Sequence, residues 1–166
     1  MRDDSLQNSA TTTVLGHSVG LASDHAAPAL RALVKSWLHG QGFEVRDYGT
    51  ETAESVDYPD YAARLSQGLL TGEVSWGVAL CGTGQGMNMA LNRYPQVRAA
   101  LCDSETLARL ARAHNDANVM VLGGRVSGSL VAEACLQAFT TTAFAAGRHA
   151  RRVAKLSAKP LEDIKT

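Results

Sequence analysis

Residues 76–86 read Trp76-Gly77-Val78-Ala79-Leu80-Cys81-Gly82-Thr83-Gly84-Gln85-Gly86, a short apolar run followed by a cysteine and three alternate glycines. The run predicts a buried strand, and the glycines predict a tight loop that enters a helix. Such a loop points several backbone N–H groups at one spot, and glycine lets a ligand approach them closely. The stretch therefore predicts an α/β fold with an anion cradle beside a thiol.

Short apolar runs alternate with longer segments of helical period on both sides of this stretch. We expect strands at Val19–Ser23, Phe43–Asp47, Val74–Leu80, Ala99–Leu101 and Val119–Leu122, and helices at Pro28–His39, Pro59–Leu70, Met87–Asn92, Ser104–Ala113, Ser129–Phe139 and, last and short, Arg148–Ser157. Pro28 and Pro59 suit first-turn positions, and Ser104 suits an N-cap. The pattern is typical of strand-helix units wound around a mostly parallel sheet, here of five strands.

Length and composition favour one domain, because 166 residues with 45% hydrophobic content can bury a sizeable core. We expect a flexible extension over residues 1–17, the domain over 18–157 and a tail over 158–166. Lysines plus arginines equal aspartates plus glutamates at 16 each, which gives no support for a nucleic-acid or membrane partner. No signal peptide is recognisable, and the three cysteines form no metal-binding or disulfide pattern. These features predict a cytoplasmic protein and give no sign of a metal site.

Ligands of open parallel sheets bind beyond the carboxyl ends of the strands. The first predicted strand ends at Asp24 and His25, the third at Cys81, and the fifth just before Arg125. These side chains should therefore meet at one edge of the sheet. A thiolate is favoured at a helix N-terminus, so Cys81 can serve as a base or a nucleophile there.

Each of these residue types also has a structural interpretation. Cys102 and Cys135 are best explained as buried apolar cysteines, while the glycine loop favours a functional role for Cys81. Asp24 is equally suited to binding hydroxyls and to capping the next helix. His114, at a predicted helix exit, is suited to complementing the helix C-terminus.

The glycine loop differs from nucleotide-binding motifs. It lacks the lysine of a P-loop, and its G-x-G-x-G spacing departs from the dinucleotide pattern G-x-G-x-x-G. Its N–H groups suit an oxyanion or an enediolate, and the Thr83 hydroxyl can add a hydrogen bond. Arg148 and Arg152 stand four residues apart, so they either grip a phosphate together, with Arg125 as a third cation, or form a solvated helix face. The combination suggests a small phosphorylated polyol as ligand.

Seven ordered motifs between residues 18 and 157 resemble the ribose-5-phosphate isomerase B family, within the wider ribose/galactose isomerase group. They are Ser23-Asp24-His25, Asp57-Tyr58-Pro59-Asp60-Tyr61-Ala62, Cys81-Gly82-Thr83-Gly84-Gln85-Gly86, Val97-Arg98-Ala99-Ala100, His114-Asn115-Asp116-Ala117-Asn118, Gly124-Arg125 and Arg148-His149-Ala150-Arg151-Arg152. The resemblance implies a Rossmann-like three-layer sandwich with a mostly parallel five-stranded sheet. It implies a cofactor-free aldose–ketose isomerase of a sugar phosphate. It also implies a homodimer, or a dimer of dimers, with active sites at the interface.

The resemblance also implies roles for single residues. Cys81 would be the base that moves a proton between C2 and C1, and His114, supplied by the partner subunit, would open the sugar ring. Thr83 would be the third catalytic residue, holding the enediolate oxygen. The substrate-binding residues would be Gly82, Gly84, Gln85 and Gly86 at the same oxygen, Asp24 and Asn115 at hydroxyls, His25, Arg125, Arg148 and Arg152 at the phosphate, and Tyr58 in the pocket wall.

Two positions after the glycine loop bear on the identity of the base and of the substrate. Met87 stands where some members carry a glutamate base, which places this chain with the cysteine type. Asn88 replaces a usual serine, so the sugar itself stays open between ribose 5-phosphate, allose or galactose 6-phosphate and a tetrulose 4-phosphate. Two other classes of function remain: a non-catalytic sugar-phosphate binding protein, and a redox role for Cys81.

Overall fold

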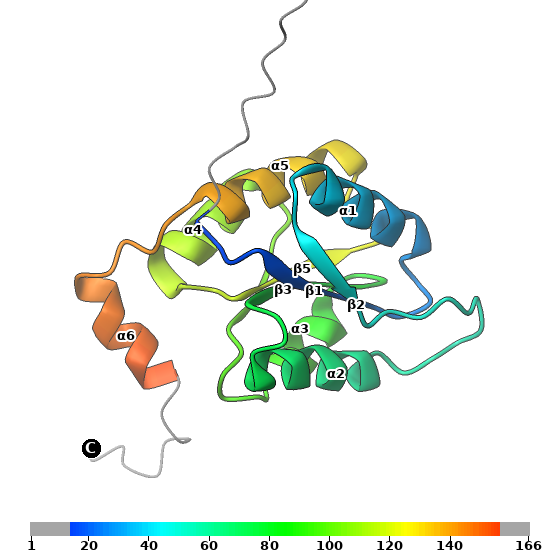
Figure 1. Cartoon of the computed structure of the whole chain (residues 1–166), viewed down its shortest axis with the longest axis horizontal. Coiled ribbons are helices and arrows are strands. Elements are labelled where there is room, and N and C mark those ends of the chain that lie inside the picture. Colours follow the sequence, from blue (N-terminus) through cyan, green and yellow to red (C-terminus); the bar gives the residue numbers. More distant parts are fainter. Residues whose placement is uncertain (1–13, 157–166) are drawn as a thin grey trace, which may run out of the picture.

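The computed structural model describes residues 14–156, and its five strands form one sheet in the order β2-β1-β3-β5-β4 (Figure 1). The strands are β1 (Ser18–Ser23), β2 (Glu44–Asp47), β3 (Trp76–Cys81), β4 (Ala99–Leu101) and β5 (Val119–Gly123). All neighbouring strands pair in parallel. The predicted α/β fold is confirmed, and the sheet is parallel throughout.

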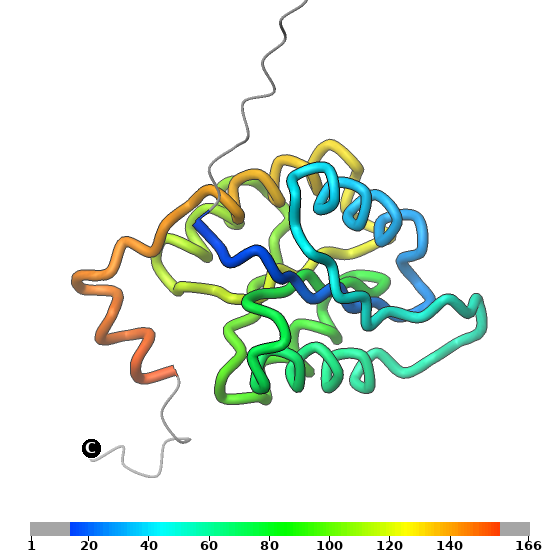
Figure 2. The backbone as a smooth tube through the Cα atoms, viewed as in Figure 1, coloured from blue at the N-terminus to red at the C-terminus, as the bar shows by residue number. Residues whose placement is uncertain are grey.

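Within residues 14–156, six helices accompany the sheet: α1 (Pro28–Gly40), α2 (Tyr58–Thr71), α3 (Gln85–Leu91), α4 (Glu105–Asn115), α5 (Ser129–Thr141) and α6 (Arg148–Leu156). In Figure 1, α1, α4 and α5 cover one face of the sheet, and α2 and α3 cover the other. The backbone tube shows that α6 stands apart from both layers (Figure 2). The main body is therefore a three-layer sandwich, as predicted.

Strand β3 lies at the centre of the sheet and is buried along its whole length. Its side chains alternate between the two layers, as the period of a strand requires. Trp76, Val78 and Leu80 pack into the core beneath α1, α4 and α5, whereas Ala79 and Cys81 belong to the core beneath α2 and α3. The alternation places the Cys81 thiol on the α2–α3 side, at the carboxyl end of the strand.

The predicted element boundaries agree with the structure to within about two residues at most ends. Pro28 and Pro59 occupy first-turn positions, and the Ser104 side chain caps α4 by accepting a hydrogen bond from the Leu107 N–H at 3.4 Å. One difference concerns the glycine loop, because α3 begins at Gln85 rather than at residue 87. Gln85 and Gly86 therefore belong to the first turn of a helix.

The predicted extension and tail lie almost wholly outside the described residues. Of the extension, residues 14–17 are described. The Val14 N–H donates to the Thr140 carbonyl oxygen at 3.0 Å, and the Gly16 carbonyl oxygen accepts from Trp76 Nε1 at 3.0 Å. Within residues 14–156, no helix is both long and apolar enough to cross a bilayer.

Candidate active site

Three loops meet at the carboxyl edge of the sheet, after β1, β3 and β5. The Gly124 N–H donates to the Cys81 carbonyl oxygen at 2.8 Å, and the Arg125 N–H donates to that of Gly82 at 2.9 Å. The Asp24 N–H donates to the Leu80 carbonyl oxygen at 3.3 Å. These backbone bonds fix the loops against one another, so the predicted convergence of Asp24, Cys81 and Arg125 is observed.

Cys81 is the last residue of β3 and is 5% exposed. Its Sγ accepts a hydrogen bond from the Gly84 N–H at 3.2 Å, so the sulfur has a donor close by when it carries charge. Among the described residues, no hydrogen-bond acceptor pairs with the N–H groups of Gly82 and Thr83. Those two donors stand next to the thiol and are available to a ligand, as the predicted anion cradle requires.

Two glycines of the loop are needed where they stand. Gly84 has a φ of +80°, and a side chain there would also meet the Leu122 backbone at 3.2 Å. A Cβ on Gly86 would lie 2.6 Å from Cζ of Tyr58. The Tyr58 ring therefore lies directly against the loop, which brings this predicted pocket residue to the site.

Asp24 and His25 stand at the end of β1 beside a cavity of about 400 Å³. The Asp24 carboxylate is buried and accepts the Ala26 N–H at 2.9 Å, in a turn that precedes α1. The N-cap residue of α1 is Ala27, so Asp24 does not cap the helix. His25 accepts the Val56 N–H at its Nδ1, at 3.1 Å.

The remaining predicted site residues lie at the opposite edge. Helix α4 runs back across the sheet and delivers His114 and Asn115 near the start of β5, whereas Cys81 pairs with Gly123 at the end of β5. Arg148 and Arg152 are exposed on α6, a helix without buried residues among those described. Within one chain, these four side chains do not meet the thiol.

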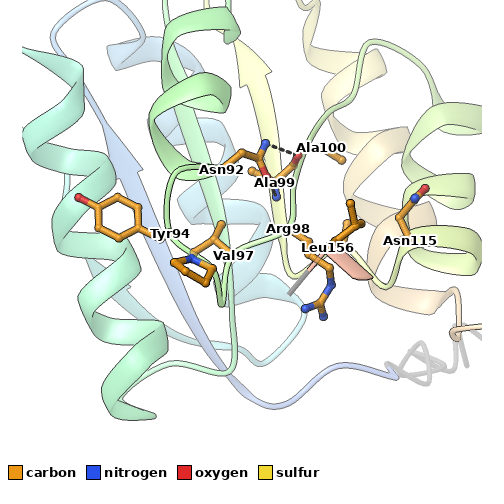
Figure 3. Close-up of a pocket in the computed structure, with 10 residues that line it drawn as sticks. Asn92, Tyr94, Val97, Arg98, Ala99, Ala100, Asn115 and Leu156 are labelled. Carbon is orange, nitrogen blue, oxygen red and sulfur yellow. Dashed lines mark hydrogen bonds between the residues drawn. The ribbon is translucent and has the colours of Figure 1, made fainter. Parts of the chain in front are cut away.

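His114 stacks on His149 of α6, with ring centroids 4.3 Å apart and an angle of 7° between the planes. Desolvation lowers the pKa of His149, and the nearby charges of His114, Arg148 and Arg152 lower it further. The stack fastens α6 to the end of α4. Both helices border a cavity of about 430 Å³, with Asn115 and Leu156 on one side and Tyr94 and Val97 on the other (Figure 3).

The other two thiols are structural, as their interpretation from sequence predicted. Cys102 and Cys135 are 1% and 0% exposed. Burial raises the pKa of Cys102 to about 12 and that of Cys135 to about 11, and nearby acidic groups add to both shifts. Such thiols stay protonated at neutral pH and are poor nucleophiles.

The sequence analysis missed a charged cluster beside the carboxyl edge. Asp47, the last residue of β2, accepts hydrogen bonds from Arg31 at 2.7 Å and from Lys35 at 2.9 Å. Desolvation opposes ionisation, but hydrogen bonds from Lys35, the Gly49 N–H and Arg31 lower the pKa of Asp47. Asp47 stands at the carboxyl end of a predicted strand, as Asp24 does. The same argument from strand ends could therefore have predicted it from the sequence.

Comparison with known proteins identifies the family to which this chain is similar. The family described as Ribose/Galactose Isomerase matches residues 19–156. The crystal structure of a ribose 5-phosphate isomerase from Thermotoga maritima superposes with a TM-score of 0.82, at 50% identity over 84% of this chain and 97% of that one. Ribose-5-phosphate isomerase B of Escherichia coli is 36% identical over 84% of this chain and 94% of its own length. D-erythrulose-4-phosphate isomerase of Pectobacterium atrosepticum is 35% identical over 84% and 92%.

The fold and these matches define a sugar-phosphate isomerase, an enzyme of the aldose–ketose class. More narrowly, the chain belongs to the ribose/galactose isomerase family, and its relatives include proteins named ribose-5-phosphate isomerase B.

Proposed function

We propose that the protein interconverts D-ribose 5-phosphate and D-ribulose 5-phosphate, with Cys81 as the base. The observation that carries this proposal is the buried thiol beside two backbone donors without partners, those of Gly82 and Thr83. A base next to a preorganised oxyanion site is what proton transfer through an enediolate requires.

The proposed reaction moves protons and needs no other reactant. The Cys81 thiolate takes the proton from C2 of the open-chain aldose, and the electron pair left on C2 forms the enediolate double bond. The Gly82 and Thr83 N–H groups hold the oxyanion while the proton returns at C1. The hydroxyl proton passes from O2 to O1, so substrate and product are isomers.

The closed form of the sugar has to open first. We assign this step to His114, which would protonate the ring oxygen while a proton leaves O1. Because His114 and Cys81 lie at opposite edges of one sheet, the proposal needs the His114 of a second copy of the chain. Arg148 and Arg152 of that copy would bind the phosphate together with His25 and Arg125.

A homodimer also accounts for the surface around α6. This helix has no buried residue among those described, and Leu156 is 59% exposed beside the 430 Å³ cavity. Strand β4 is the edge of the sheet next to that cavity, so apolar groups and a strand edge face outward together. A partner subunit bound at this surface would cover both the apolar groups and the strand edge. Helix α6 of the first chain would then lie close to the Cys81 of that partner.

The direct test replaces the base. Cys81→Ala is expected to lower kcat about a thousandfold, since a positioned general base contributes on the order of 10²–10⁴. Binding of an unreactive sugar-phosphate analogue should change little, as measured by calorimetry. Cys135→Ala is the matched control, because it removes a thiol far from the proposed chemistry. Full turnover in Cys81→Ala would remove the proposed base.

The sugar is tested on the same protein. Ribose 5-phosphate, allose 6-phosphate, galactose 6-phosphate and erythrulose 4-phosphate would be compared by kcat/KM. The proposal expects ribose 5-phosphate to have the highest value. A higher value for erythrulose 4-phosphate would keep the mechanism and replace the substrate, whereas binding without turnover of all four would favour a binding protein.

A further inference from the structure

The segment between β2 and α2, residues 48–57, forms an irregular loop at the end of the molecule away from α6 (Figure 1). Thr50, Glu51 and Thr52 of this loop line the 400 Å³ cavity together with Asp24 and His25. Inside the loop, Thr50 Oγ1 accepts the Thr52 N–H at 3.1 Å. Most of its residues are exposed, so its place must be fixed by contacts with the rest of the domain.

One side chain supplies two of those contacts, and the Tyr48 and Thr50 N–H groups add bonds to the Leu21 and Ser23 carbonyl oxygens of β1. Arg31 of α1 is 11% exposed and donates from Nη1 to the Thr50 carbonyl oxygen at 3.0 Å. Its Nη2 donates to the Glu51 carboxylate at 2.6 Å and to Asp47 at 2.7 Å, and its Nε donates to Asp47 at 3.2 Å. The guanidinium thus joins α1, the end of β2 and the loop.

At its other end, the same loop contacts His25, which we propose binds the phosphate. The Val56 N–H donates to Nδ1 of His25 at 3.1 Å. A neutral imidazole that accepts at Nδ1 carries its proton on Nε2, so His25 keeps one N–H donor for a ligand. The tautomer of His25 therefore depends on where the loop places Val56.

We propose that Arg31 is a positioning residue, which clamps the loop of residues 48–57 and so holds His25 with its proton on Nε2, ready to donate to the substrate's phosphate. This inference rests on the proposed function for the role of His25. Arginine is suited to the task because its planar fork holds five N–H donors in a fixed, spread geometry, whereas the three donors of an ammonium group sit on one freely rotating nitrogen.

Arg31→Lys keeps the positive charge and removes the fork. The expected result is a KM for the sugar phosphate about tenfold higher, with kcat within about threefold, because the phosphate contact contributes to binding. Lys35→Gln is the matched control: Lys35 bonds the same Asp47 but makes no bond to the loop, so its KM should change less than about threefold. An equal rise in both variants would mean that KM depends on the bonds to Asp47 that Arg31 and Lys35 share, not on the bonds from Arg31 to the loop, and would overturn the clamp.

A readout without substrate separates the clamp from the proposed function. At about pH 8, where an ordinary histidine is neutral, the ¹⁵N shifts of His25 should report the Nε2–H tautomer in the wild-type protein. In Arg31→Lys they should move toward a mixture of tautomers, and amide exchange should rise over residues 48–57 alone. Glu51→Gln, which leaves the bond to the Thr50 carbonyl, should keep the wild-type tautomer.

Unchanged ¹⁵N shifts and unchanged exchange in Arg31→Lys would overturn the inference even in an active enzyme. Changed shifts in a protein that turns over no sugar phosphate would instead support the clamp and count against the proposed function.

Discussion

The two edges of the sheet carry the two halves of the predicted site, and they are built differently. At the carboxyl edge, backbone groups make the site: Cys81 is buried, and its loop is bonded to the loops after β1 and β5. At the amino edge, the groups are side chains on helix ends, and Arg148 and Arg152 are exposed on a helix without buried residues of its own. The first half is assembled within one chain, whereas the proposed role of the second half depends on a second copy of the chain.

The two halves share one anchoring device, an aspartate between two cations. Asp47 joins Arg31 and Lys35 near the cradle, and Asp116 joins Arg98 at 3.0 Å and Arg112 at 2.8 Å, directly after His114 and Asn115. Asp116 has a φ of +46°, a left-handed conformation that ends α4. Each half is thus anchored by ion pairs at its base, and the difference between them lies in what faces outward.

The largest expected effect comes from mixing two inactive variants. In a dimer of Cys81→Ala and His114→Asn chains, one of the two sites would combine the intact Cys81 of one chain with the intact His114 of the other. The purified mixed dimer should therefore regain about half of the wild-type activity, because a two-fold interface uses the same patch of both subunits. Co-expression with two different tags, followed by a kinetic assay, measures this recovery.

Each variant purified alone is the control and should stay below about one per cent of wild-type activity, within the usual contribution of an acid–base group. A mixed dimer as inactive as its parents would break the comparison, since both halves would then have to work within one chain.

The second prediction concerns the backbone half. Gly86→Ala places a methyl group 2.6 Å from the present position of the Tyr58 ring, so the ring has to move from the loop. We expect kcat/KM to fall about tenfold, equivalent to about 1.4 kcal/mol. Gly128→Ala is the matched control, because a Cβ there meets nothing within 4 Å and the φ of −71° suits alanine. Equal activity of the two variants would show that the Tyr58 contact is dispensable.

The same contrast explains what could be predicted from the sequence. Strand ends are set by local patterns, so the approach of Asp24, Cys81 and Arg125 followed from the parallel order of the strands. The predicted start of α3 differs from the structure because Gly84 and Gly86 together look like a loop, yet Gly86 lies within the helix and is required by the Tyr58 ring, a contact between distant parts of the chain. Only the resemblance makes His114 a site residue, and spacing leaves Arg148 open between a phosphate grip and a solvated face, since no spacing within one chain brings either to the thiol.

The third prediction tests the basic helix. Arg148→Ala is expected to raise KM about tenfold with a small change in kcat, because a lost phosphate contact weakens binding of substrate and transition state alike. Arg151→Ala, on the same helix but turned about 100° from Arg152, should have a clearly smaller effect. Steady-state kinetics at two salt concentrations would measure both. An unchanged KM in Arg148→Ala would leave α6 as a solvated face.

The smallest expected effect concerns the joint between α4 and α6. Desolvation and the neighbouring charges of His114, Arg148 and Arg152 lower the pKa of His149 in the folded protein. A group whose pKa falls on folding stabilises the folded state above its unfolded pKa, about 6.5 for histidine, and this contribution is lost as the pH falls through the lower folded value. We therefore expect the contact of α6 with α4 to loosen under mildly acidic conditions, with faster amide exchange over residues 148–156 and little change in the sheet.

In His114→Gln, the NMR titration of His149 should move up toward the ordinary value but stay below it, because desolvation remains. If the substitution left the His149 titration unmoved, the His114 ring would exert no charge repulsion on His149. The contact between α4 and α6 would then rest on the packing of the two rings alone.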